Sequence, residues 1–405
     1  MKYDVIAGLD IGNGYVKGQV SVNGFLELID MPSVVSYTVG VDIPQNPTET
    51  SMSVSNLVND LDATVTSRLV SSVDSGRVLF GRRAILSGGS QREFNIEDTT
   101  PKCSDALSTM LVLGSLAASV LSNYYNEHKT LPKEVLEIDA MLGVALPIED
   151  YMAYKDVYRN QLMSDTHQVI IQNFETSVTV SVRFKDVVVL AEGAAAQHAI
   201  RRLGADFLQL ALDDAREHGA EIDKEYTGEM LAGATNTIGI DIGEGTVNFP
   251  VFVSDAMAIE SSSSIKKGYG TVLTNVVSEL RNTNYAFESR KDLAEFMLKK
   301  ETMPSKRNLQ DLVQRHIDEQ VRIFVMDIMK EYSNVFRKVG MRTDVIYIYG
   351  GGSGNVHNVL YPRILEASTM FSGNCVPVIY LDAVYSRDLN RKGLFEVAKD
   401  LANYQ

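Results

Sequence analysis

The pattern with the clearest chemical meaning is the stretch Asp10-Ile11-Gly12-Asn13-Gly14-Tyr15-Val16-Lys17 near the start of the chain. It follows a run of apolar residues, so we expect a buried strand that ends in a carboxylate, then a glycine turn, then a strand that carries a lysine. Such a turn leaves backbone N–H groups beside a carboxylate and an ammonium group, which together suit a phosphate and its metal ion. The stretch therefore predicts a phosphate-binding loop in which Gly12, Asn13 and Gly14 contact the nucleotide.

A near copy of this loop recurs at Asp241-Ile242-Gly243-Glu244-Gly245-Thr246-Val247-Asn248. An aspartate before a single glycine turn is common turn chemistry and by itself indicates no ligand. Two such loops in equivalent positions form a stronger pattern, because internal repeats of this size imply two similar domains. We expect the two loops to face each other across a nucleotide, with Gly243, Glu244, Gly245 and Thr246 in contact with it.

The charged side chains of the loops have distinct predicted roles. Mg²⁺ prefers one or two carboxylates and keeps several water ligands, so Asp10 and Asp241 are predicted to hold it directly or through water. The Lys17 ammonium group lies near the start of the return strand, where it can reach a β- or γ-phosphate. The alternative is that Lys17 is a solvated lysine at a strand end.

Two further segments complete the predicted site. Glu192 ends an apolar strand and precedes a helix of alanines, and a carboxylate there can orient and deprotonate the water that attacks a γ-phosphate. The alternative is an acidic residue that only stabilises a helix N-terminus. Gly350, Gly351 and Gly352 follow a buried strand, and their lack of side chains lets a nucleoside approach the backbone. Glu192 and Asp241 are the predicted catalytic residues.

Length and patterning place these loops in a two-domain α/β protein. A chain of 405 residues with 45% hydrophobic and 22% charged residues is typical of globular proteins and long for a single core. We expect residues 1–200 and 201–382 to form two similar domains, with a small inserted subdomain at about 32–100. Asn23-Gly24 between alternating apolar residues predicts a hairpin, so the chain begins with three antiparallel strands.

Other elements follow from the apolar periodicity. We expect separate strands at 177–184 and 187–190, and an acidic helical segment at 201–230 that bridges the domains. Long helices are predicted at 270–300 and 306–339, the second of them closed by Gly340 as a left-handed cap.

Composition narrows the range of partners. A formal net charge of −14 argues against direct binding of nucleic acid, which requires a basic face. Cys103 and Cys375 belong to no CxxC motif and are expected to be unpaired thiols in a reducing cytosol. No signal peptide is apparent and no uninterrupted apolar run reaches the length of a membrane span, so we expect a cytoplasmic protein without membrane contact.

The two loops, Glu192 and the glycine turn together resemble the ATPase superfamily of actin, heat-shock chaperones and sugar kinases. Within this superfamily, the chain is most similar to the bacterial actin-like plasmid-segregation proteins of the ParM and Alp group. The first loop and the segments at 143–151 and 188–196 carry this closer resemblance.

The resemblance implies an actin-like fold of duplicated, ribonuclease H-like domains with a nucleotide cleft between them. It makes Gly350–Gly352 the adenosine loop, and it makes the last helix, at about 383–405 with Asn390 and Gly393, a second connecting segment that packs back on the first domain. The implied function is a filament-forming nucleotidase that uses Mg²⁺ and ATP, with GTP as an alternative, to segregate a plasmid or another replicon. The implied partners are further copies of the chain and a DNA-binding adaptor of the ParR type.

The second loop departs from the pattern of this superfamily. A glycine is expected at position 244 and an aspartate at position 248, where the chain has Glu244 and Asn248. An acid beside phosphates is unfavourable unless it points away or helps to hold the metal. Two other functions on the same fold are a small-molecule kinase, for which no acceptor motif is found, and a chaperone-type ATPase, for which no substrate-binding domain follows.

Overall fold

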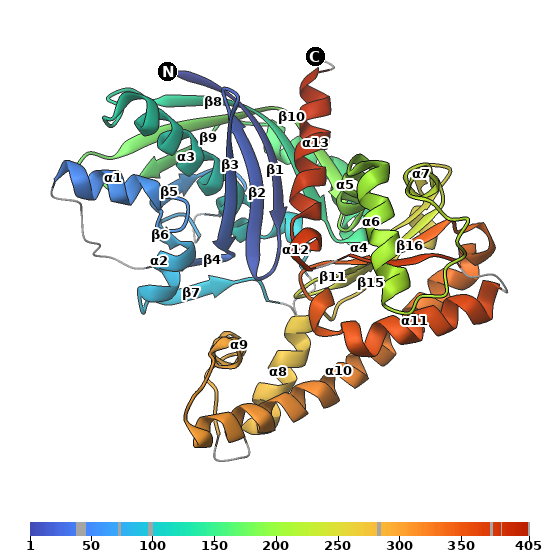
Figure 1. The fold of residues 1–405 in the computed structure, drawn as a ribbon. Coiled ribbons are helices and arrows are strands. Elements are labelled where there is room, and N and C mark those ends of the chain that lie inside the picture. Colours follow the sequence, from blue (N-terminus) through green and yellow to red (C-terminus); the bar gives the residue numbers. More distant parts are fainter. Residues whose placement is uncertain are drawn as a thin grey trace. The chain divides into compact units, whose positions relative to one another are not determined.

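The computed structural model describes residues 1–37, 46–71, 74–95, 100–281, 285–372, 376–381 and 383–403. The chain divides into two compact units, one formed by Met1–Ala199 with Asp388–Gln405 and the other by Ile200–Arg387. Each unit contains a β-sheet with helices packed on it (Figure 1), which confirms the α/β class expected from the sequence.

The first unit is built on a mixed sheet whose ten described strands follow the order β3-β2-β1-β8-β10-β9-β5-β6-β4-β7. Its strands are β1 (Lys2–Ile11), β2 (Tyr15–Val22), β3 (Phe25–Pro32), β4 (Val34–Tyr37), β5 (Asp62–Thr66), β6 (Arg77–Phe80), β7 (Ser90–Glu93), β8 (Leu136–Leu146), β9 (His167–Ile171) and β10 (Val178–Ala191). β1 is antiparallel to β2 and parallel to β8, which is parallel to β10. The region expected to form a small inserted subdomain therefore contributes four strands to this same sheet.

The helices of the first unit connect these strands. They are α1 (Pro47–Ser55), α2 (Gly81–Leu86), the 3-10 turn η1 (Lys102–Ser104), α3 (Ala106–His128), α4 (Ile148–Met163), α5 (Ala194–Arg202) and α13 (Leu389–Asn403). The chain leaves the first unit within α5 and returns to it just before α13.

The chain begins with the predicted antiparallel meander. β1, β2 and β3 pair in sequence order, and Asn23 and Gly24 form the second turn with φ values of 48° and 90°. Both residues thus adopt the positive φ that this type of two-residue hairpin requires. The prediction of three initial antiparallel strands is confirmed.

α3 lies in the core of the first unit. Its residues Leu107 and Leu111 are fully buried in one hydrophobic cluster with Leu9 of β1. By length and composition α3 could also cross a membrane, although serines and a threonine interrupt its apolar residues. Almost all of the apolar window is buried inside the unit, as in the core helix of a folded domain.

Two glycines shape the opposite face of this sheet. Gly8 of β1 pairs with Gly143 of β8. Successive residues of a strand point to opposite faces of the sheet. Leu9 faces α3, so Gly8 lies on the other face. A Cβ atom at either glycine would overlap the backbone of α13 at Leu394 or Phe395. α13 therefore lies directly on the backbone of the sheet, as Figure 1 shows beside β1.

β10 is one continuous strand, although two separate strands were predicted there. Its pairing with β8 shifts by one residue between Phe184 and Asp186. The extra residue Lys185 is thus accommodated in a β-bulge, which bends a strand without ending it.

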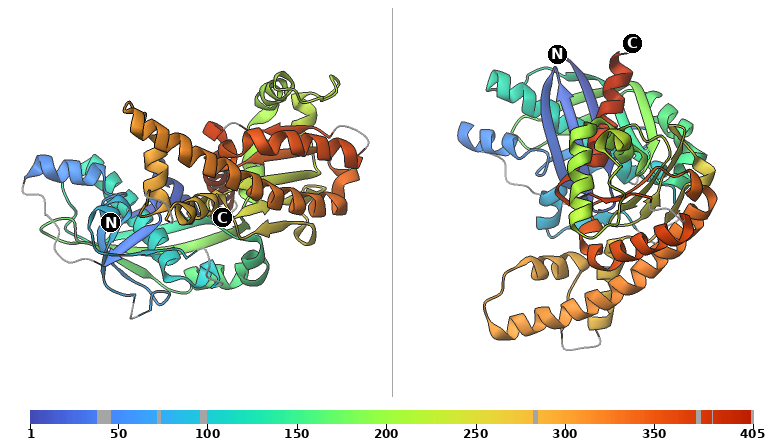
Figure 2. Two further views of the ribbon diagram at one scale, coloured as in Figure 1. Left: turned by 90° about the horizontal axis from the view of Figure 1, so that it is seen from below. Right: turned by 45° about the vertical axis from the view of Figure 1, so that its right-hand side comes forward.

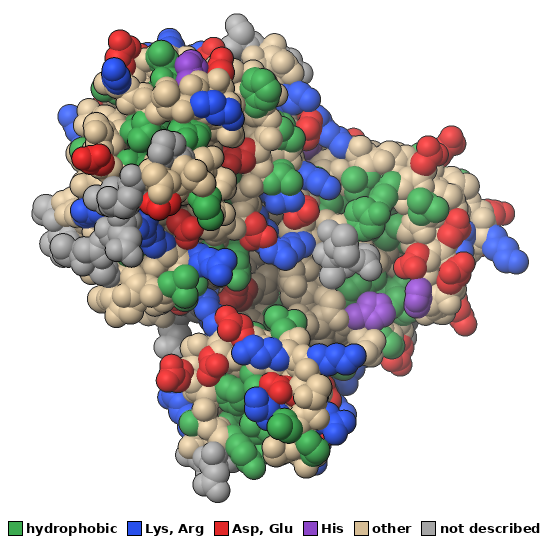
Figure 3. All heavy atoms as spheres, turned by 60° about the vertical axis from the view of Figure 1, so that its left-hand side comes forward, with side chains coloured by type: hydrophobic (Ala, Val, Ile, Leu, Met, Phe, Trp, Pro, Cys, Tyr) green, Lys and Arg blue, Asp and Glu red, His purple; other side chains and the backbone are tan. Residues whose placement is uncertain are grey.

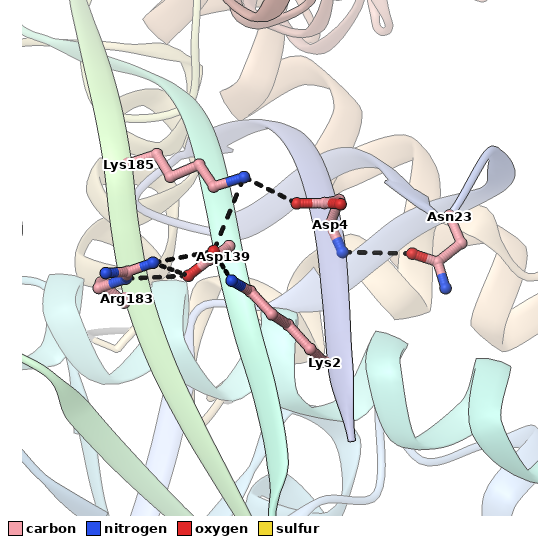
Figure 4. A network of polar contacts seen from close by, with 6 residues as sticks. All are labelled: Lys2, Asp4, Asn23, Asp139, Arg183 and Lys185. Carbon is pink, nitrogen blue, oxygen red and sulfur yellow. Dashed lines mark hydrogen bonds and ion pairs between the residues drawn. The ribbon is translucent and has the colours of Figure 1, made fainter.

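The amino-terminal ends of the parallel strands are joined by an ion-pair network around Asp139 (Figure 4). The buried Asp139 carboxylate lies 2.7 Å from the Lys2 ammonium group and accepts two hydrogen bonds of 2.9 Å from Arg183, while Lys185 links it to Asp4. Burial alone would raise the pKa of Asp139, but the contacts with Lys2 and Arg183 outweigh it and hold this pKa below its usual value. The network fastens β1, β8 and β10 at the end of the sheet opposite to Asp10.

The second unit contains a sheet of seven described strands: β11 (Thr237–Ile242), β12 (Val247–Phe249), β13 (Val251–Val253), β14 (Ala256–Met257), β15 (Ser263–Ile265), β16 (Val345–Tyr349) and β17 (Val378–Tyr380). β11 pairs antiparallel with β12 and β13 and parallel with β16, which is followed by β17. β11 is thus placed like β1, with an antiparallel return strand on one side and a parallel strand on the other.

The helices of the second unit are α6 (Gly204–Glu217), α7 (Gly228–Ala232), α8 (Tyr269–Leu280), α9 (Arg290–Leu298), α10 (Pro304–Val339), α11 (His357–Ser372) and α12 (Ala383–Ser386). The predicted helical segment at 201–230 is interrupted after α6, where Gly219 has a φ of 90°. The predicted helix at 270–300 is two helices, because the Ser289 side chain caps a new start at α9.

α8, α9 and the first half of α10 form a helical arm that extends from the sheet of the second unit (Figures 1 and 2). Side chains of α8 bind those of α10, as in the hydrogen bond of 2.9 Å between Asn275 and Gln320. α10 does not end in the predicted left-handed glycine. Gly340 has a right-handed φ of −45°, and a Cβ atom there would lie 2.7 Å from the Phe336 ring, so this glycine makes room for the ring.

Candidate functional site

The first predicted loop joins β1 to β2 and is held closed by its own backbone. Asp10 lies opposite Lys17 in the ladder between the two strands, and the Gly12 N–H donates a hydrogen bond of 3.0 Å to the Tyr15 carbonyl. A Cβ atom at Gly12 would lie 2.8 Å from that same oxygen, so the turn needs a glycine here. The Ser33 hydroxyl and N–H donate to the carbonyls of Gly12 and Gly14, which braces the loop from outside.

Four other polar side chains surround the Asp10 carboxylate. Burial raises the pKa of Asp10, and the nearby carboxylate of Glu192 raises it further. The ammonium groups of Lys17 and Lys102 and a hydrogen bond from Asn390 act in the opposite direction. We call Asp10, Lys17, Lys102, Glu192 and Asn390 the Asp10 cluster. It lies at the carboxyl ends of the parallel strands β1 and β10, the edge at which α/β sheets bind ligands.

Glu192 directly follows β10, as predicted, and it forms an ion pair within the cluster. Its carboxylate lies 2.9 Å from the Lys102 ammonium group, and the two side chains are only 13% and 10% exposed. The backbone of Glu192 is fixed because its N–H donates to the Leu146 carbonyl at the end of β8. Lys102 is fixed in turn by a hydrogen bond of 3.0 Å from its N–H to the Asp150 carboxylate.

Sequence reasoning missed Lys102 and found Asn390 only through the family resemblance. Lys102 follows Pro101 in an irregular segment, where a lone lysine gives no pattern that distinguishes it from a solvated one. Asn390 reaches Asp10 because α13 lies on Gly8, which faces the same side of β1 as Asp10. A glycine two residues before a strand-end carboxylate is the signal that could have indicated a helix at this position.

The second loop repeats the backbone of the first. Asp241 is buried and lies opposite Asn248 between β11 and β12, and the Gly243 N–H donates to the Thr246 carbonyl at 2.9 Å. The Asn248 amide donates to the Thr246 hydroxyl at 3.3 Å. Asn248 therefore supports the turn where the first loop has a lysine.

Glu244, the unexpected acid of the second loop, is paired with Arg290 at the start of α9. Their side chains are 34% and 17% exposed and lie 2.9 Å apart. The Glu244 carbonyl also accepts a hydrogen bond of 2.8 Å from Gly270 N–H at the start of α8. The carboxylate that looked unfavourable beside phosphates is thus compensated by the helical arm, and this arginine was not predicted.

The glycine turn at 350–352 packs against the second loop. Gly350 has a φ of 104°, and a Cβ atom on it would lie 2.5 Å from the Asp241 carboxylate. The Gly352 N–H donates to the Ile242 carbonyl at 2.8 Å. Gly350 and Gly352 are thus required by this close backbone contact, whereas the predicted role of Gly351 and its neighbours in nucleoside binding stays a prediction.

The donor set of the described residues bears on metal binding. Among them, no group of three or more His, Cys, Asp or Glu side chains could hold a metal ion. A metal at either loop would therefore have few carboxylate ligands, Asp10 at the first loop or Asp241 at the second, and would complete its shell with phosphate and water. That is the ligand set that Mg²⁺ accepts. Cys103 is a free buried thiol, and Cys375 lies outside the described residues.

Two family models match the chain, one in each unit. Residues 8–194 match the N-terminal domain of actin like proteins, and residues 239–361 match the C-terminal domain of the archaeal actin homologue MreB-like family. No curated protein matches the chain at a significant level.

Solved structures share the fold over nearly the whole length. The actin-like protein Alp7A is 16% identical, with a TM-score of 0.63 over 100% of this chain and 99% of that one. A ParM from a 15-stranded filament of Clostridium botulinum is 15% identical, with a TM-score of 0.64 over 98% and 99%. The ParM of Bacillus thuringiensis with ATP is 14% identical, with a TM-score of 0.58 over 99% of both chains. Residues 8–194 and 239–361 thus match two domain families of actin homologues, and the chain has the actin-like fold, with ParM and Alp7A among its structural neighbours.

Proposed function

We propose that this protein is an actin-like nucleotidase that binds ATP, or GTP in its place, polymerises into filaments and hydrolyses the nucleotide within them. The observation that carries the proposal is the Asp10 cluster, in which two ammonium groups and two carboxylates meet at the carboxyl ends of β1 and β10. Filament-forming ParM has the same fold, and a ParM with ATP is among the structural neighbours.

The residues of the cluster divide the proposed chemistry between them. Lys17 binds a phosphate of the nucleotide as a point charge, and the N–H groups of Asn13 and Gly14 face the same ligand, since the Gly12 N–H is bonded to the Tyr15 carbonyl. Glu192 orients the attacking water and accepts its proton. Asp10 and Asp241 hold Mg²⁺ directly or through water, and bound Mg²⁺ neutralises part of the phosphate charge. Gly350–Gly352 contact the nucleoside.

We further propose that the filaments segregate a plasmid or another replicon through a DNA-binding adaptor of the ParR type. A net charge of −14 suits a basic protein partner better than DNA itself. On the face shown in Figure 3, acidic and basic side chains are interspersed, and the described residues form no continuous basic surface there.

Sedimentation and electron microscopy with Mg-ATP, Mg-GTP, ADP or no nucleotide test the proposal. We expect polymer that pellets with the triphosphate and dissolves as phosphate is released. No pelletable polymer with either triphosphate over a wide range of protein concentrations would overturn the filament function. Transfer of phosphate to a small acceptor without polymer would instead point to a kinase.

The Glu192→Ala variant tests the catalytic role. General-base catalysis contributes about 10²- to 10⁴-fold to a rate, so we expect phosphate release to slow by at least about 100-fold while nucleotide binding and polymerisation persist. Glu149→Ala, an acidic residue in the first turn of α4, is a control for loss of negative charge in the same unit. Phosphate release from Glu192→Ala at the wild-type rate would contradict the assignment.

A further inference from the structure

The ion pair of Lys102 and Glu192 has a consequence for how hydrolysis is controlled. We propose that Lys102 senses the terminal phosphate: it pairs with Glu192 until a nucleoside triphosphate binds, then moves to the terminal phosphate and releases the Glu192 carboxylate. This inference rests on the proposed nucleotidase function. It adds Lys102 to Lys17 as a second phosphate-binding cation, and it makes the change of partner by Lys102 a control on Glu192.

The ion pair of Lys102 and Glu192 is buried, and a phosphate can compete with it. Both side chains are about nine-tenths buried and their charged atoms lie 2.9 Å apart, so little water competes for either. Separation of the two side chains would leave buried charges uncompensated, so the ion pair persists until another charged group replaces one of the partners. A terminal phosphate carries about two negative charges near neutral pH, against one for a carboxylate, and therefore attracts the ammonium group more strongly.

Lys102 lies where a nucleotide phosphate bound at the first loop would be within its reach. Lys102 acts on the Asp10 carboxylate together with Lys17, so both ammonium groups belong to the cluster beside the first phosphate loop. The backbone of Lys102 is anchored to Asp150, so the exchange requires movement of its side chain alone. Its Nζ also lies 5.6 Å from the centre of the Phe94 ring, whose face is attractive to a cation that changes partners.

The pair with Lys102 also affects Glu192 as a base. A carboxylate that accepts a hydrogen bond from an ammonium group has fewer lone pairs available for a water molecule. In the pair with Lys102, Glu192 is thus held but poorly suited to accept a proton. Release by the γ-phosphate makes the base available only when its substrate is present, and a diphosphate, which has no γ-phosphate, leaves it paired.

Binding measurements test the exchange directly. We compare ADP with a non-hydrolysable ATP analogue, both with Mg²⁺, on the wild-type chain, Lys102→Met, Lys102→Arg and the exposed-site control Lys133→Met. A charge-assisted contact made only to the terminal phosphate predicts that Lys102→Met weakens the analogue by about tenfold and ADP by less than about twofold. Lys102→Arg retains the charge and is expected to restore most of the preference for the analogue.

A mutant cycle with Glu192→Gln supplies a readout that a merely structural role would not move. If Glu192 competes with the phosphate for Lys102, Glu192→Gln tightens the analogue by about threefold or more in the wild-type background and has no such effect in Lys102→Met. Equal losses of ADP and analogue in Lys102→Met, or the same effect of Glu192→Gln in both backgrounds, would overturn the proposal. If Lys102→Met fails to fold, Glu192→Gln alone decides, because unchanged analogue affinity excludes the exchange.

The two proposals fail in different ways. Absence of nucleotide binding by the wild-type chain would overturn the nucleotidase function and this inference with it. Intact binding with an unchanged ratio of ADP to analogue affinity in Lys102→Met would overturn only the role of Lys102.

Discussion

The loop after β1 and the loop after β11 share a backbone hydrogen bond and differ in their charged side chains. In each, an aspartate ends a central strand, and a glycine N–H donates to the carbonyl three residues ahead, at 3.0 Å in the first loop and 2.9 Å in the second. Opposite the aspartate stands Lys17 in the first loop and Asn248 in the second. The two loops thus share the turn hydrogen bond and differ in the side chain that faces the aspartate.

The difference indicates a division of work. The first loop gathers Lys17, Lys102 and Glu192 around Asp10, which are the groups that phosphate chemistry requires. The charged residue of the second loop, Glu244, is instead bound by Arg290 and so ties this loop to the helical arm. We infer that the first loop carries most of the chemistry and that the second loop holds position.

The largest expected effect comes from removing each aspartate in turn. We expect Asp10→Ala to lower the affinity for Mg-nucleotide by about 100-fold and Asp241→Ala by about tenfold, as measured by titration calorimetry. Burial and Glu192 raise the pKa of Asp10, so its ionised form is unfavourable in the folded protein and its removal should leave the melting temperature unchanged or higher. Equal losses for the two variants would remove the proposed asymmetry, and unchanged affinity of Asp10→Ala would refute its role.

The residues opposite the aspartates give the next comparison. Lys17→Met removes a charge directed at a phosphate and is expected to weaken triphosphate binding by about tenfold, whereas Asn248→Ala should change it by less than about threefold. Fluorescent nucleotide titration measures both. A larger loss for Asn248→Ala would show that the second loop, not the first, dominates phosphate binding.

Asp139, at the opposite end of the first sheet, differs from Asp10 because its pKa is lowered and not raised. The pKa of Asp139 is below its usual value, so its ion pairs stabilise the fold above about pH 4, and this contribution is lost as the pH falls through the folded pKa. We expect Asp139→Asn to lower the free energy of unfolding by about 1 kcal/mol at pH 7, and we expect this difference to shrink below about pH 4 and to vanish only once the pH is below the folded pKa of Asp139. Urea unfolding across this range checks it. A difference that persists in acid would assign the effect to packing.

The smallest expected effect concerns Glu244 and Arg290. The pair is partly exposed, so a double-mutant cycle with Glu244→Gln and Arg290→Gln should give a coupling energy of about 0.5 kcal/mol in thermal unfolding. Nucleotide affinity should change by less than about twofold, because Arg290 compensates an acid that does not act on the ligand. A tighter affinity in Glu244→Gln would show that this carboxylate does repel the phosphates.

The sequence predicted those parts of the fold that short patterns specify. The Asn23-Gly24 turn, the first meander and the positions of Asp10, Asp241 and Glu192 near strand ends all follow from local periodicity and turn chemistry. The misplaced features depend on distant contacts. The β-bulge at Lys185 is fixed by pairing with β8, and Gly340 is set by the Phe336 ring rather than by helix capping.

The sequence predicted the two loops and their carboxylates, but it did not predict the cations that pair with Glu192 and Glu244. Lys102 and Arg290 each come from an irregular segment or a helix start and meet their carboxylates through the folded chain. No spacing in the sequence reveals such pairs. A glycine pattern did hold information, because Gly8 and Gly143 mark the place where α13 approaches the sheet.

The contact between α13 and the first sheet has a consequence for folding during synthesis of the chain. The first unit consists of residues 1–199 together with residues 388–405, so the whole second unit is synthesised between its two parts. Until α13 emerges, the glycine surface of β1 and β8 is uncovered and Asp10 lacks the hydrogen bond from Asn390. A nascent chain that still lacks α13 therefore carries an incomplete Asp10 cluster.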